Sequence, residues 1–429
     1  MDVALSRYQD ALDYLYARTT GSFKFGLERT FALLRELGRP DASFPSLHIA
    51  GTNGKGSSVA TAEALLRGRG MRVAKYTSPH LVDFRERIVV NGVPIPEDDV
   101  LEFITRHTPL VERLGASFFE ATTVMAFDYF ARANVDVAII ETGLGGRLDS
   151  TNVITPVAAG VSSIGLDHTE YLGTTLDEIA VEKAGIFKSG HAAVIGELDA
   201  HVRGVLAREA QSHGATSIRS VADECEISDV SVEDGGTSFT LRALNDERRL
   251  RTPLAGRHQA TNTAFTLLLL AAAGEPYATS LADAERHLAT VRVPGRFQHV
   301  GNFIFDVAHN ADGAAVLAQT LRSVNPPRPV TALLSVLRDK DWRQMMRALR
   351  SVVDQFVLTV APTAPENRAW DLDEVGRFAA EDHLDARSVR DFDRALEVAG
   401  EYGGTTLVTG SFHTVGDAML RLQVSPFTG

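Results

Sequence analysis

A glycine-rich segment, LHIAGTNGKGS at residues 47–57, has the composition of a loop that binds phosphate. Glycines allow backbone N–H groups to approach a phosphate closely, the start of a helix adds positive potential, and Lys55 supplies a mobile positive charge. A serine after such a loop can reach Mg²⁺. The segment departs from the pattern G-x-x-x-x-G-K followed by Ser or Thr, because Ile49 replaces the first glycine and Gly56 separates Lys55 from Ser57. A tight turn without nucleotide is the alternative to phosphate binding. The candidate phosphate-binding residues are Thr52, Asn53, Gly54, Lys55, Gly56 and Ser57.

Two further polar groups follow apolar runs. Glu141 directly follows residues 137–140, and Asp167 and His168 follow the run 157–164. In an open parallel sheet the ligand crevice lies at the carboxyl ends of the strands, so a phosphate loop, a carboxylate and an imidazole should face one crevice. Carboxylate oxygens suit a Mg²⁺ ion that bridges nucleotide phosphates, whereas imidazole is an unusual magnesium ligand. For Glu141 alone, a helix cap or a salt bridge is the alternative.

Lys183 lies in the stretch DEIAVEKAG, residues 177–185, which is typical of a helix ended by glycine. Spacing alone predicts a solvated lysine that pairs with a carboxylate such as Asp177 or Glu178.

The elements that must position these residues follow an α/β rhythm from about residue 45. Apolar runs at 47–50, 72–76, 135–140, 157–164 and 192–195 are predicted strands, each followed by a helical stretch. Their continuous apolar character suits strands covered on both faces. The segment 57–66, rich in Ala and Leu and closed by glycines, is a predicted helix. The pattern indicates an α/β fold that begins with a P-loop-type domain built on a parallel sheet.

The chain changes character at residues 215–256. The run EISDVSVEDGGTSFTLRA alternates polar with apolar residues around an Asp-Gly-Gly turn, which predicts a β-hairpin and hence a small antiparallel addition to the first domain. After a helical stretch at 260–273, the residues Val-Pro-Gly-Arg at 293–296 are typical of a hinge. A second rhythm, with strands at 302–307, 330–335, 355–360 and 405–409, predicts a C-terminal Rossmann-like α/β domain. We therefore expect two domains, residues 1–293 and 294–429.

Composition excludes several classes of protein. The length of 429 residues allows two or three domains at roughly 150 residues each. A net charge of −12 without a basic cluster argues against a nucleic-acid binder. One cysteine, Cys225, excludes an internal disulfide and a cysteine-based zinc site. The N-terminus lacks the features of a signal peptide, and no apolar run reaches the ~18 residues of a membrane span. We expect a soluble cytoplasmic protein that does not bind a membrane.

Beyond these physical arguments, a set of motifs keeps a fixed order along nearly the whole chain. They are GTNGKGS at 51–57, TSPH at 77–80, ETGLGGRLDSTN at 141–152, GLDH at 165–168, EKAGI at 182–186, GRHQATN at 256–262, PGRF at 294–297 and DVAHN at 306–310. Together they closely resemble the dihydrofolate synthase/folylpolyglutamate synthase family of the Mur ligase superfamily. Each motif alone is modest support, but the ordered set is highly specific.

The resemblance implies a Mur-ligase-like ATP-binding domain, a C-terminal glutamate-ligase domain and an ATP-dependent carboxylate-amine ligase. A pteroate or folate carboxylate would take the γ-phosphoryl group of ATP, and the amine of L-glutamate would attack the acyl phosphate. A carboxylate is a poor electrophile, so phosphorylation supplies a leaving group. Mg²⁺, Lys55 and Arg296 would offset the repulsion between the anions.

The resemblance also assigns roles to single residues. The implied catalytic residues are Lys55, Glu141, His168 and Lys183, and the implied ligands of two Mg²⁺ sites are Ser57, Ser78, Glu141, His168 and Lys183. Lys183 matches a lysine that the family carboxylates with CO₂, which turns a cation into an oxygen ligand. Asn262 resembles an adenine contact, Arg296 a phosphate contact from the hinge, and Asp306 a ribose or nucleotide contact. A helix-start hydrogen bond and a strand-end cap are the alternatives for Asn262 and Asp306.

The substrate side follows from the same resemblance. The implied folate contacts are Phe25, Gly26, Leu27, Phe119, Glu120, Thr123, Leu148, Asp149 and Ser150, although a Phe or Leu at these places could equally belong to the core. His309 and Ser411 match positions associated with glutamate binding. His413 stands where many relatives have an aliphatic or aromatic residue. The implied partners are small molecules only (pteroate or folate, L-glutamate and ATP), and we expect a monomer.

Three other functions are possible. A cell-wall ligase that adds an amino acid to a nucleotide-linked acid shares the chemistry, but the FGL segment at 25–27 and the TSPH motif favour folate. A nucleotide switch or ATPase would have the phosphate loop without Lys183, Asp306, His309 and the Ser411 region. A catalytically dead binding module would lack Glu141, His168 or Lys183, which are all present.

Overall fold

A sheet of eight strands forms the centre of the N-terminal region of this computed structural model, which describes residues 7–19 and 26–427. Its spatial order is β4 (Val93–Pro94), β3 (Ile88–Val90), β2 (Val73–Tyr76), β5 (Val137–Glu141), β1 (Ser46–Ala50), β6 (Ala158–Val161), β7 (Ala192–Ile195) and β8 (Ser217–Ser220). The strands from β2 to β8 run parallel, and β3 and β4 are antiparallel additions at one edge. The five predicted strands of this region are confirmed to within a few residues at their ends.

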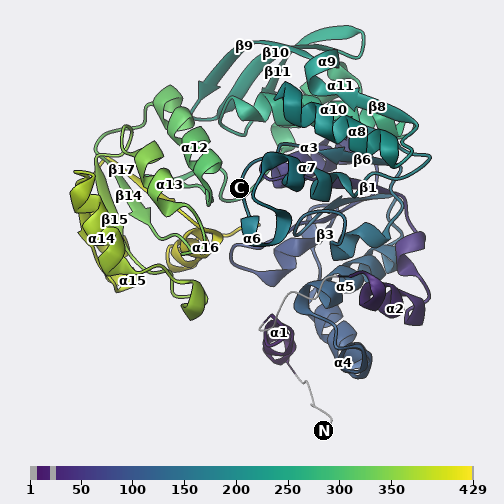
Figure 1. Ribbon diagram of the computed structural model, residues 1–429, viewed down its shortest axis with the longest axis horizontal. Helices are drawn as coiled ribbons and strands as arrows, with labels where there is room; N and C mark the ends of the chain where they lie inside the picture. Colours follow the sequence, from purple (N-terminus) through teal and green to yellow (C-terminus); the bar gives the residue numbers. More distant parts are fainter. Residues whose placement is uncertain (1–6, 20–25, 428–429) are drawn as a thin grey trace.

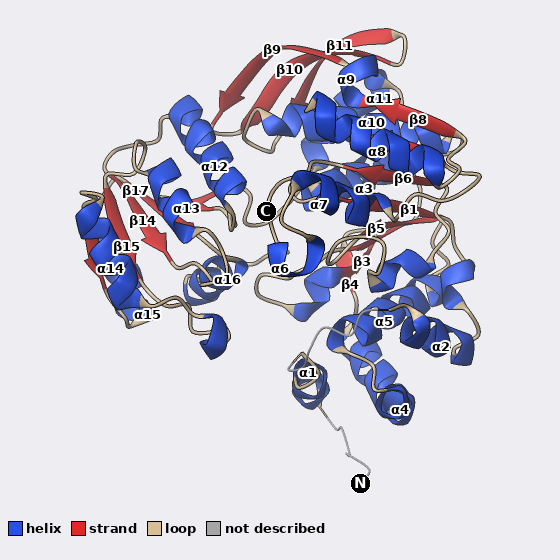
Figure 2. Cartoon of the chain, in the orientation of Figure 1, coloured by secondary structure: helices blue, strands red, loops and turns tan. Residues whose placement is uncertain are grey.

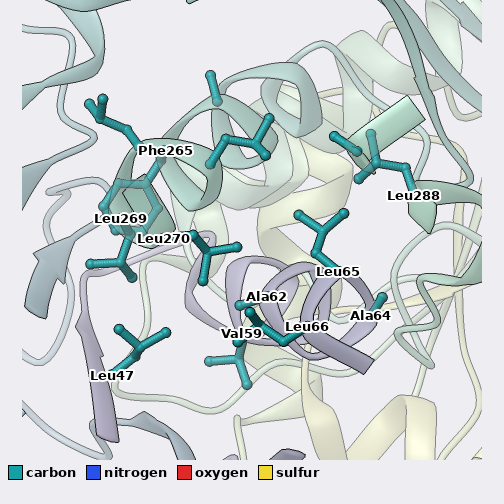
Figure 3. Packing of buried hydrophobic residues seen from close by; sticks show 14 of the residues in the cluster. Leu47, Val59, Ala62, Ala64, Leu65, Leu66, Phe265, Leu269, Leu270 and Leu288 are labelled. Atoms are coloured by element: carbon teal, nitrogen blue, oxygen red, sulfur yellow. The ribbon is translucent and has the colours of Figure 1, made fainter. Parts of the chain in front are cut away.

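Helices cover both faces of this sheet because alternate side chains of its strands point to opposite sides. On one face, Leu47 and Ile49 pack against α3 (Lys55–Gly68), α10 (His258–Ala273) and α11 (Leu281–His287). Figure 3 shows Val59 and Ala62 of α3 near Leu269 and Leu270 of α10. The opposite face is covered by α1 (Tyr8–Tyr16), α2 (Glu28–Glu36), α4 (Glu97–Leu114), α5 (Phe118–Arg132), α7 (Leu176–Ala184) and α8 (Ala200–Ser212). The region also contains two short helices, α6 (Thr169–Leu172) and α9 (Val221–Glu224).

An antiparallel sheet of three strands follows the main sheet in sequence: β9 (Glu226–Glu233), β10 (Gly236–Ala243) and β11 (Asp246–Thr252). The predicted hairpin is its first pair, and the structure adds a third strand. Phe239 and Leu250 of this sheet pack into the same core as α10. Residues 217–220, which we expected to belong to this addition, instead form β8 at the edge of the main sheet.

The C-terminal region holds a second α/β sheet, with the order β12 (Gln298–Val300), β13 (Phe303–Phe305), β17 (Thr405–Thr409), β14 (Val330–Leu334), β15 (Gln355–Leu358) and β16 (Ala386–Ser388). All pairs except β12 with β13 are parallel. One face is covered by α12 (Ala311–Val324), α13 (Trp342–Leu349) and α14 (Leu372–Glu381), and the other by α15 (Phe392–Glu401) and α16 (Phe412–Arg421). The structure confirms the predicted α/β class with a small antiparallel sheet and a second, mixed C-terminal sheet (Figure 2).

The two regions lie side by side in Figure 1, with the C-terminal region, in green to yellow, left of the N-terminal region. Leu81 of the N-terminal region packs against Gly295 and Gly416, which belong to the connecting segment and to α16. We call this boundary, where residues from both regions meet, the seam. Within the described part of the chain, no helix combines the length and the apolar character that crossing a membrane requires.

Candidate active site

The predicted phosphate loop connects β1 to α3. Gly54 is the N-cap of α3, with φ of 88°, and a Cβ at this residue would lie 2.5 Å from the side-chain oxygen of Asn262. The segment after β6 holds the loop through two hydrogen bonds: the Thr52 N–H donates to Ser163 O (2.6 Å), and Ser162 Oγ donates to Asn53 O (2.7 Å). Gly54 has no side chain that could cap the helix, so the N–H groups of the first turn of α3 are available to an anion.

Two lysines share one carbonyl of this loop. Lys55 Nζ and Lys183 Nζ each donate to Gly51 O at 2.9 Å. Lys183 is buried, and burial together with the charge of Lys55 lowers its pKa to about 7. The prediction from spacing that Lys183 is solvated and pairs with Asp177 or Glu178 is wrong, because the helix α7 turns this residue toward the loop instead of toward water.

Glu141 ends β5 directly beside the loop. Its Oε2 accepts the Ser78 N–H at 3.3 Å, and its Oε1 lies 4.0 Å from Lys55 Nζ. Burial raises the pKa of Glu141 against the opposing charges of Lys55, Arg296 and Arg87. The phosphate loop and the carboxylate therefore meet at the carboxyl end of the sheet, as the strand order predicts.

The residues around Glu141 fit a Mg²⁺ ion that is bound mostly by phosphates and water. Among the residues that the structure describes, no three His, Cys, Asp or Glu side chains form a ready metal cluster. Mg²⁺ needs no such cage, because it is usually held by one or two carboxylates, water and substrate phosphates. Glu141, with Ser57 in the first turn of α3 and Ser78 at its carboxylate, supplies this kind of oxygen site.

His168 lies at the seam, where its Nε2 is 3.9 Å from Asp167 Oδ1. Burial and the charge of Lys340 lower the pKa of His168 to about 4, so its imidazole is neutral at pH 7. The charge of Lys183, another predicted metal ligand, also contributes to lowering the pKa of His168.

Asp167 joins the two regions. Its carboxylate forms an ion pair with Lys340, accepts a hydrogen bond from Asn310 Nδ2 (3.1 Å) and lies 3.4 Å from His309 Nε2. Burial would raise the pKa of Asp167, but the hydrogen bond from His309 and the charges of His168 and Lys340 hold it below its ordinary value.

Asn310 also links this cluster to the phosphate loop. Its Nδ2 lies 3.3 Å from the side-chain oxygen of Asn53. Asn310 and Lys340 were not among the predicted site residues, and Asp167 was noted beside His168 at the strand end without a role of its own. The strand-end argument could have found Lys340, because it follows β14 closely, but nothing in the sequence pairs it with Asp167.

A line of polar side chains leads from the loop toward the connecting segment. Asn262 Nδ2 donates to Gln259 Oε1 (3.0 Å), and Gln259 Nε2 lies 2.9 Å from His258 Nε2. Burial and the charge of Arg296 lower the pKa of His258 to about 4. These contacts connect Asn262, which adjoins Gly54 of the phosphate loop, to His258, on which the charge of Arg296 acts.

Asp306 has the geometry of a structural cap. Its Oδ2 accepts the Phe297 N–H (3.0 Å) and its Oδ1 accepts the Ala308 N–H (2.9 Å). Both carboxylate oxygens therefore tie the connecting segment to the end of β13, which corresponds to the strand-end alternative. Ser411 likewise caps α16, since its Oγ accepts the Thr414 N–H at 3.0 Å.

The predicted folate contacts fall into two groups. Phe119 and Thr123 of α5 face β2: the Phe119 ring lies 6.0 Å from the Tyr76 ring, and Thr123 Oγ1 is 3.2 Å from the Tyr76 hydroxyl. Gly26 and Leu27 precede α2 and are half-buried, while Phe25 lies outside the described residues. The rings of Tyr76 and Phe119 form an aromatic wall at the end of β2.

In the second group, the polar side chains of Glu120 and Asp149 already bond to other residues of the protein. Glu120 completes the capping box of α5 and pairs with Arg29 at 2.9 Å. Asp149 Oδ2 accepts the N–H groups of Gly143 and Leu144 at 2.9 and 2.8 Å, so it holds the loop after β5. Leu148, half-buried, and Ser150, buried, flank Asp149.

Comparisons with known proteins agree with this architecture. Residues 49–270 match the family model described as the Mur ligase middle domain, and residues 295–412 match the one described as the Mur ligase, glutamate ligase domain. The dihydrofolate synthase/folylpolyglutamate synthase of Bacillus subtilis is 32% identical over 97% of this chain and 99% of its own length.

Solved structures agree over the same length. The folylpolyglutamate synthase of Mycobacterium tuberculosis complexed with ADP has a TM-score of 0.90 and 33% identity, covering 99% of this chain and 100% of that one. A bifunctional folylpolyglutamate synthase/dihydrofolate synthase with Mn, AMPPNP and L-glutamate bound has a TM-score of 0.84 and 31% identity, covering 97% and 98%. The chain belongs to the dihydrofolate synthase/folylpolyglutamate synthase family of the Mur ligases.

Proposed function

We propose that this chain is an ATP-dependent ligase that adds L-glutamate to the carboxylate of dihydropteroate, of (tetrahydro)folate polyglutamates, or of both, and releases ADP and phosphate. One observation carries the proposal: Asn310 of the C-terminal region contacts Asn53 of the phosphate loop and Asp167 at the seam. A phosphoryl donor on the loop and an amine held by the C-terminal region would therefore meet at one place.

Different side chains would serve the two steps, phosphorylation of the acceptor carboxylate and attack by the amine of L-glutamate. The first turn of α3, with Lys55 and Arg296, would bind the phosphates of ATP and neutralise the charge that develops as the acceptor carboxylate is phosphorylated. His309 and Lys340 would hold the carboxylates of L-glutamate, with Ser411 close to them. Holding the amine next to the acyl phosphate makes its attack effectively intramolecular.

Ser57, Ser78, Glu141 and His168 would hold Mg²⁺, which neutralises phosphate charge when it is bound. Lys183 is suited to carboxylation, because only an uncharged amine reacts with CO₂ and burial lowers the pKa of this amine to about 7. Its carbamate would then present an oxygen next to the loop carbonyl that the amine now contacts. Asn262 would contact the adenine, and Asp306 would support the ribose side through the connecting segment.

We also propose the expected boundary, with residues 1–293 as the ATP-binding domain and 294–429 as the glutamate-ligase domain, acting as a monomer. Helices α10 and α11, which pack in the N-terminal core, end before residue 293, and β12 of the C-terminal sheet begins at Gln298, which supports this boundary. The pterin would contact Phe119 and Thr123 of α5 and Gly26 and Leu27 before α2, with Leu148 and Ser150 nearby.

An ADP-release assay with L-glutamate tests the proposal when dihydropteroate and tetrahydrofolate are offered separately and the products are identified by mass. We expect ADP release that requires both the acceptor and L-glutamate, with a product heavier by one glutamyl group. A nucleotide-linked cell-wall acid offered as acceptor serves as the comparison. ADP release with that acid alone, or release that needs no acceptor, would refute the proposed function.

A further inference from the structure

Arg87 is a buried cation without an acidic partner among the described residues. It ends the short helix before β3 and is 7% exposed. Its side chain makes one hydrogen bond in the described part of the chain, from Nε to His80 Nδ1 at 2.7 Å, and no carboxylate there lies within 4.0 Å of it. The segment 20–25 contains no acidic residue either. An arginine stays charged even when buried, so this position favours an anion that comes from outside the chain.

The groups in contact with Arg87 orient its guanidinium, while the carboxylates of Glu86 and Glu141 act on its charge only from beyond 4.0 Å. Because His80 Nδ1 accepts the bond from Arg87, the ring proton sits on Nε2, which lies 3.3 Å from the Tyr16 hydroxyl. The Phe118 ring lies 5.1 Å from the guanidinium carbon. A neutral imidazole on one side and an aromatic face on the other hold the charge in place and leave its remaining N–H groups for a ligand.

The position of Arg87 in the sheet brings it close to the reacting groups. The Thr77 N–H donates to Arg87 O at 3.0 Å, and the next N–H, from Ser78, donates to Glu141. Consecutive N–H groups after β2 therefore bond to Arg87 and to Glu141, the carboxylate beside the phosphate loop. The guanidinium of Arg87 also lies over the Phe118 ring, and the next residue, Phe119, contacts Tyr76 in the aromatic wall described above.

We propose that Arg87 binds the carboxylate of the acceptor substrate, the group that is phosphorylated, and so determines that the acceptor is an acid. This inference rests on the proposed function. The planar fork of a guanidinium matches a carboxylate with two parallel hydrogen bonds, and the neighbouring rings suit the benzoyl group to which such a carboxylate is attached. The nucleotide phosphates have a separate set of donors at the start of α3 and at Lys55, so Arg87 serves the acceptor.

The test compares two acceptors that differ only in charge. Pteroate and its carboxamide are titrated calorimetrically into the full-length protein in the presence of a non-hydrolysable ATP analogue and Mg²⁺. We expect the wild type to bind the acid roughly 10- to 100-fold more tightly than the amide, as charge-assisted bidentate hydrogen bonds imply. In Arg87→Gln this preference should fall to about one while the affinity for the amide and for the ATP analogue is retained.

Arg85→Gln is the matched control. Arg85 lies two residues away, is half-buried and is already paired with Asp83 (2.7 Å) and Glu97 (3.5 Å), so its removal should leave the preference for the acid intact. If Arg87→Gln fails to fold, Arg87→Lys keeps the charge but loses the fork, and it should keep only a several-fold preference.

Equal loss of affinity for the acid and the amide in a folded Arg87 variant would overturn the inference, because that pattern indicates a purely structural role. An unchanged preference for the acid would overturn it as well. If the wild type binds neither pteroate nor its amide and also releases no ADP with dihydropteroate or tetrahydrofolate, the proposed function fails and this inference fails with it. Wild-type binding combined with either of the first two results overturns the role of Arg87 alone.

Discussion

Replacing Lys183 by methionine removes a buried amine and leaves a side chain of similar length. Lys183 is 5% exposed, and burial with the charge of Lys55 lowers its pKa from 10.5 to about 7. At roughly 1.4 kcal/mol for each pKa unit, the folded protein disfavours the ammonium by about 4 kcal/mol at pH 7. The lost hydrogen bond to Gly51 O offsets about 1 kcal/mol of this gain. That carbonyl keeps its bond from Lys55, so no acceptor is left unsatisfied.

The sign depends on pH in a defined way. Between the folded pKa of about 7 and the unfolded value of 10.5, the unfolded chain binds a proton that the folded chain does not bind. The stability of the wild type therefore rises with pH across this window, and the penalty is complete below pH 7. We expect Lys183→Met to be about 3 kcal/mol more stable than the wild type at pH 7 and about 1 kcal/mol more stable at pH 9. Above pH 10.5 the penalty is gone, and the lost hydrogen bond should leave the variant about 1 kcal/mol less stable than the wild type.

Urea unfolding without nucleotide, in buffer purged of CO₂, measures this difference. Far-UV circular dichroism follows the whole chain, while tryptophan fluorescence reports only the C-terminal region, because Trp342 and Trp370 are the only tryptophans. The gain should appear in the part of the transition that fluorescence does not detect. As a control of opposite sign, Lys75→Met loses the ion pair with Glu63 (2.6 Å), a carboxylate whose side chain is 6% exposed, and should destabilise. A Lys183→Met protein that is less stable than the wild type at pH 7, or a difference independent of pH, would refute the argument.

Four other changes test the site. Glu141→Ala should nearly abolish ADP release while the thermal melting curve stays close to the wild type, and normal kcat would remove Glu141 from the metal site. Lys183→Ala should lose activity and regain part of it with added small carboxylates, which can replace a carbamate oxygen; an unmodified lysine at high resolution without such rescue would count against carboxylation. Gly54→Ala should destabilise by about 1–2 kcal/mol and weaken ATP binding, because φ is 88° and a Cβ would stand 2.5 Å from a neighbouring amide oxygen; equal ATP affinity would contradict this. Lys340→Met removes the ion pair to Asp167 and should raise the radius of gyration in X-ray scattering without ligands, whereas an unchanged radius would show that other contacts hold the seam.

The sequence predicted the fold well because its signals are local. The apolar runs before Gly51, Glu141 and Asp167 fix the strands, and a parallel sheet brings their carboxyl ends to one edge whatever the intervening lengths. The short edge strands β3 and β4 gave no comparable signal, since β4 is the two-residue pair Val93–Pro94. An element this short is defined by its partner and not by its own pattern.

Burial and pairing at the site could not be predicted in the same way. Helix α7 was predicted, but spacing cannot say that Lys183 points to the loop, because this depends on the loop after β5. That loop packs against the helix so closely that a Cβ at Gly146 would lie 2.6 Å from Lys183 O. The partners of Asp167 come from residues 309, 310 and 340, far along the chain and from another sheet. Such contacts are set by how the two regions meet.

The placement of charge follows from the same geometry. The chain carries a net charge of −12, yet every molecule in the proposed reaction is an anion. The protein resolves this conflict by burying cations: Arg87 is 7% exposed, and the side chain of Lys340 is 7% exposed. Buried charges act in a medium of lower dielectric constant than surface charges and are screened less by salt. Binding of the acceptor should therefore depend only weakly on ionic strength. A steep fall in pteroate affinity between low and high salt, in the wild type but not in Arg87→Gln, would show instead that this cation is exposed to solvent in the working enzyme.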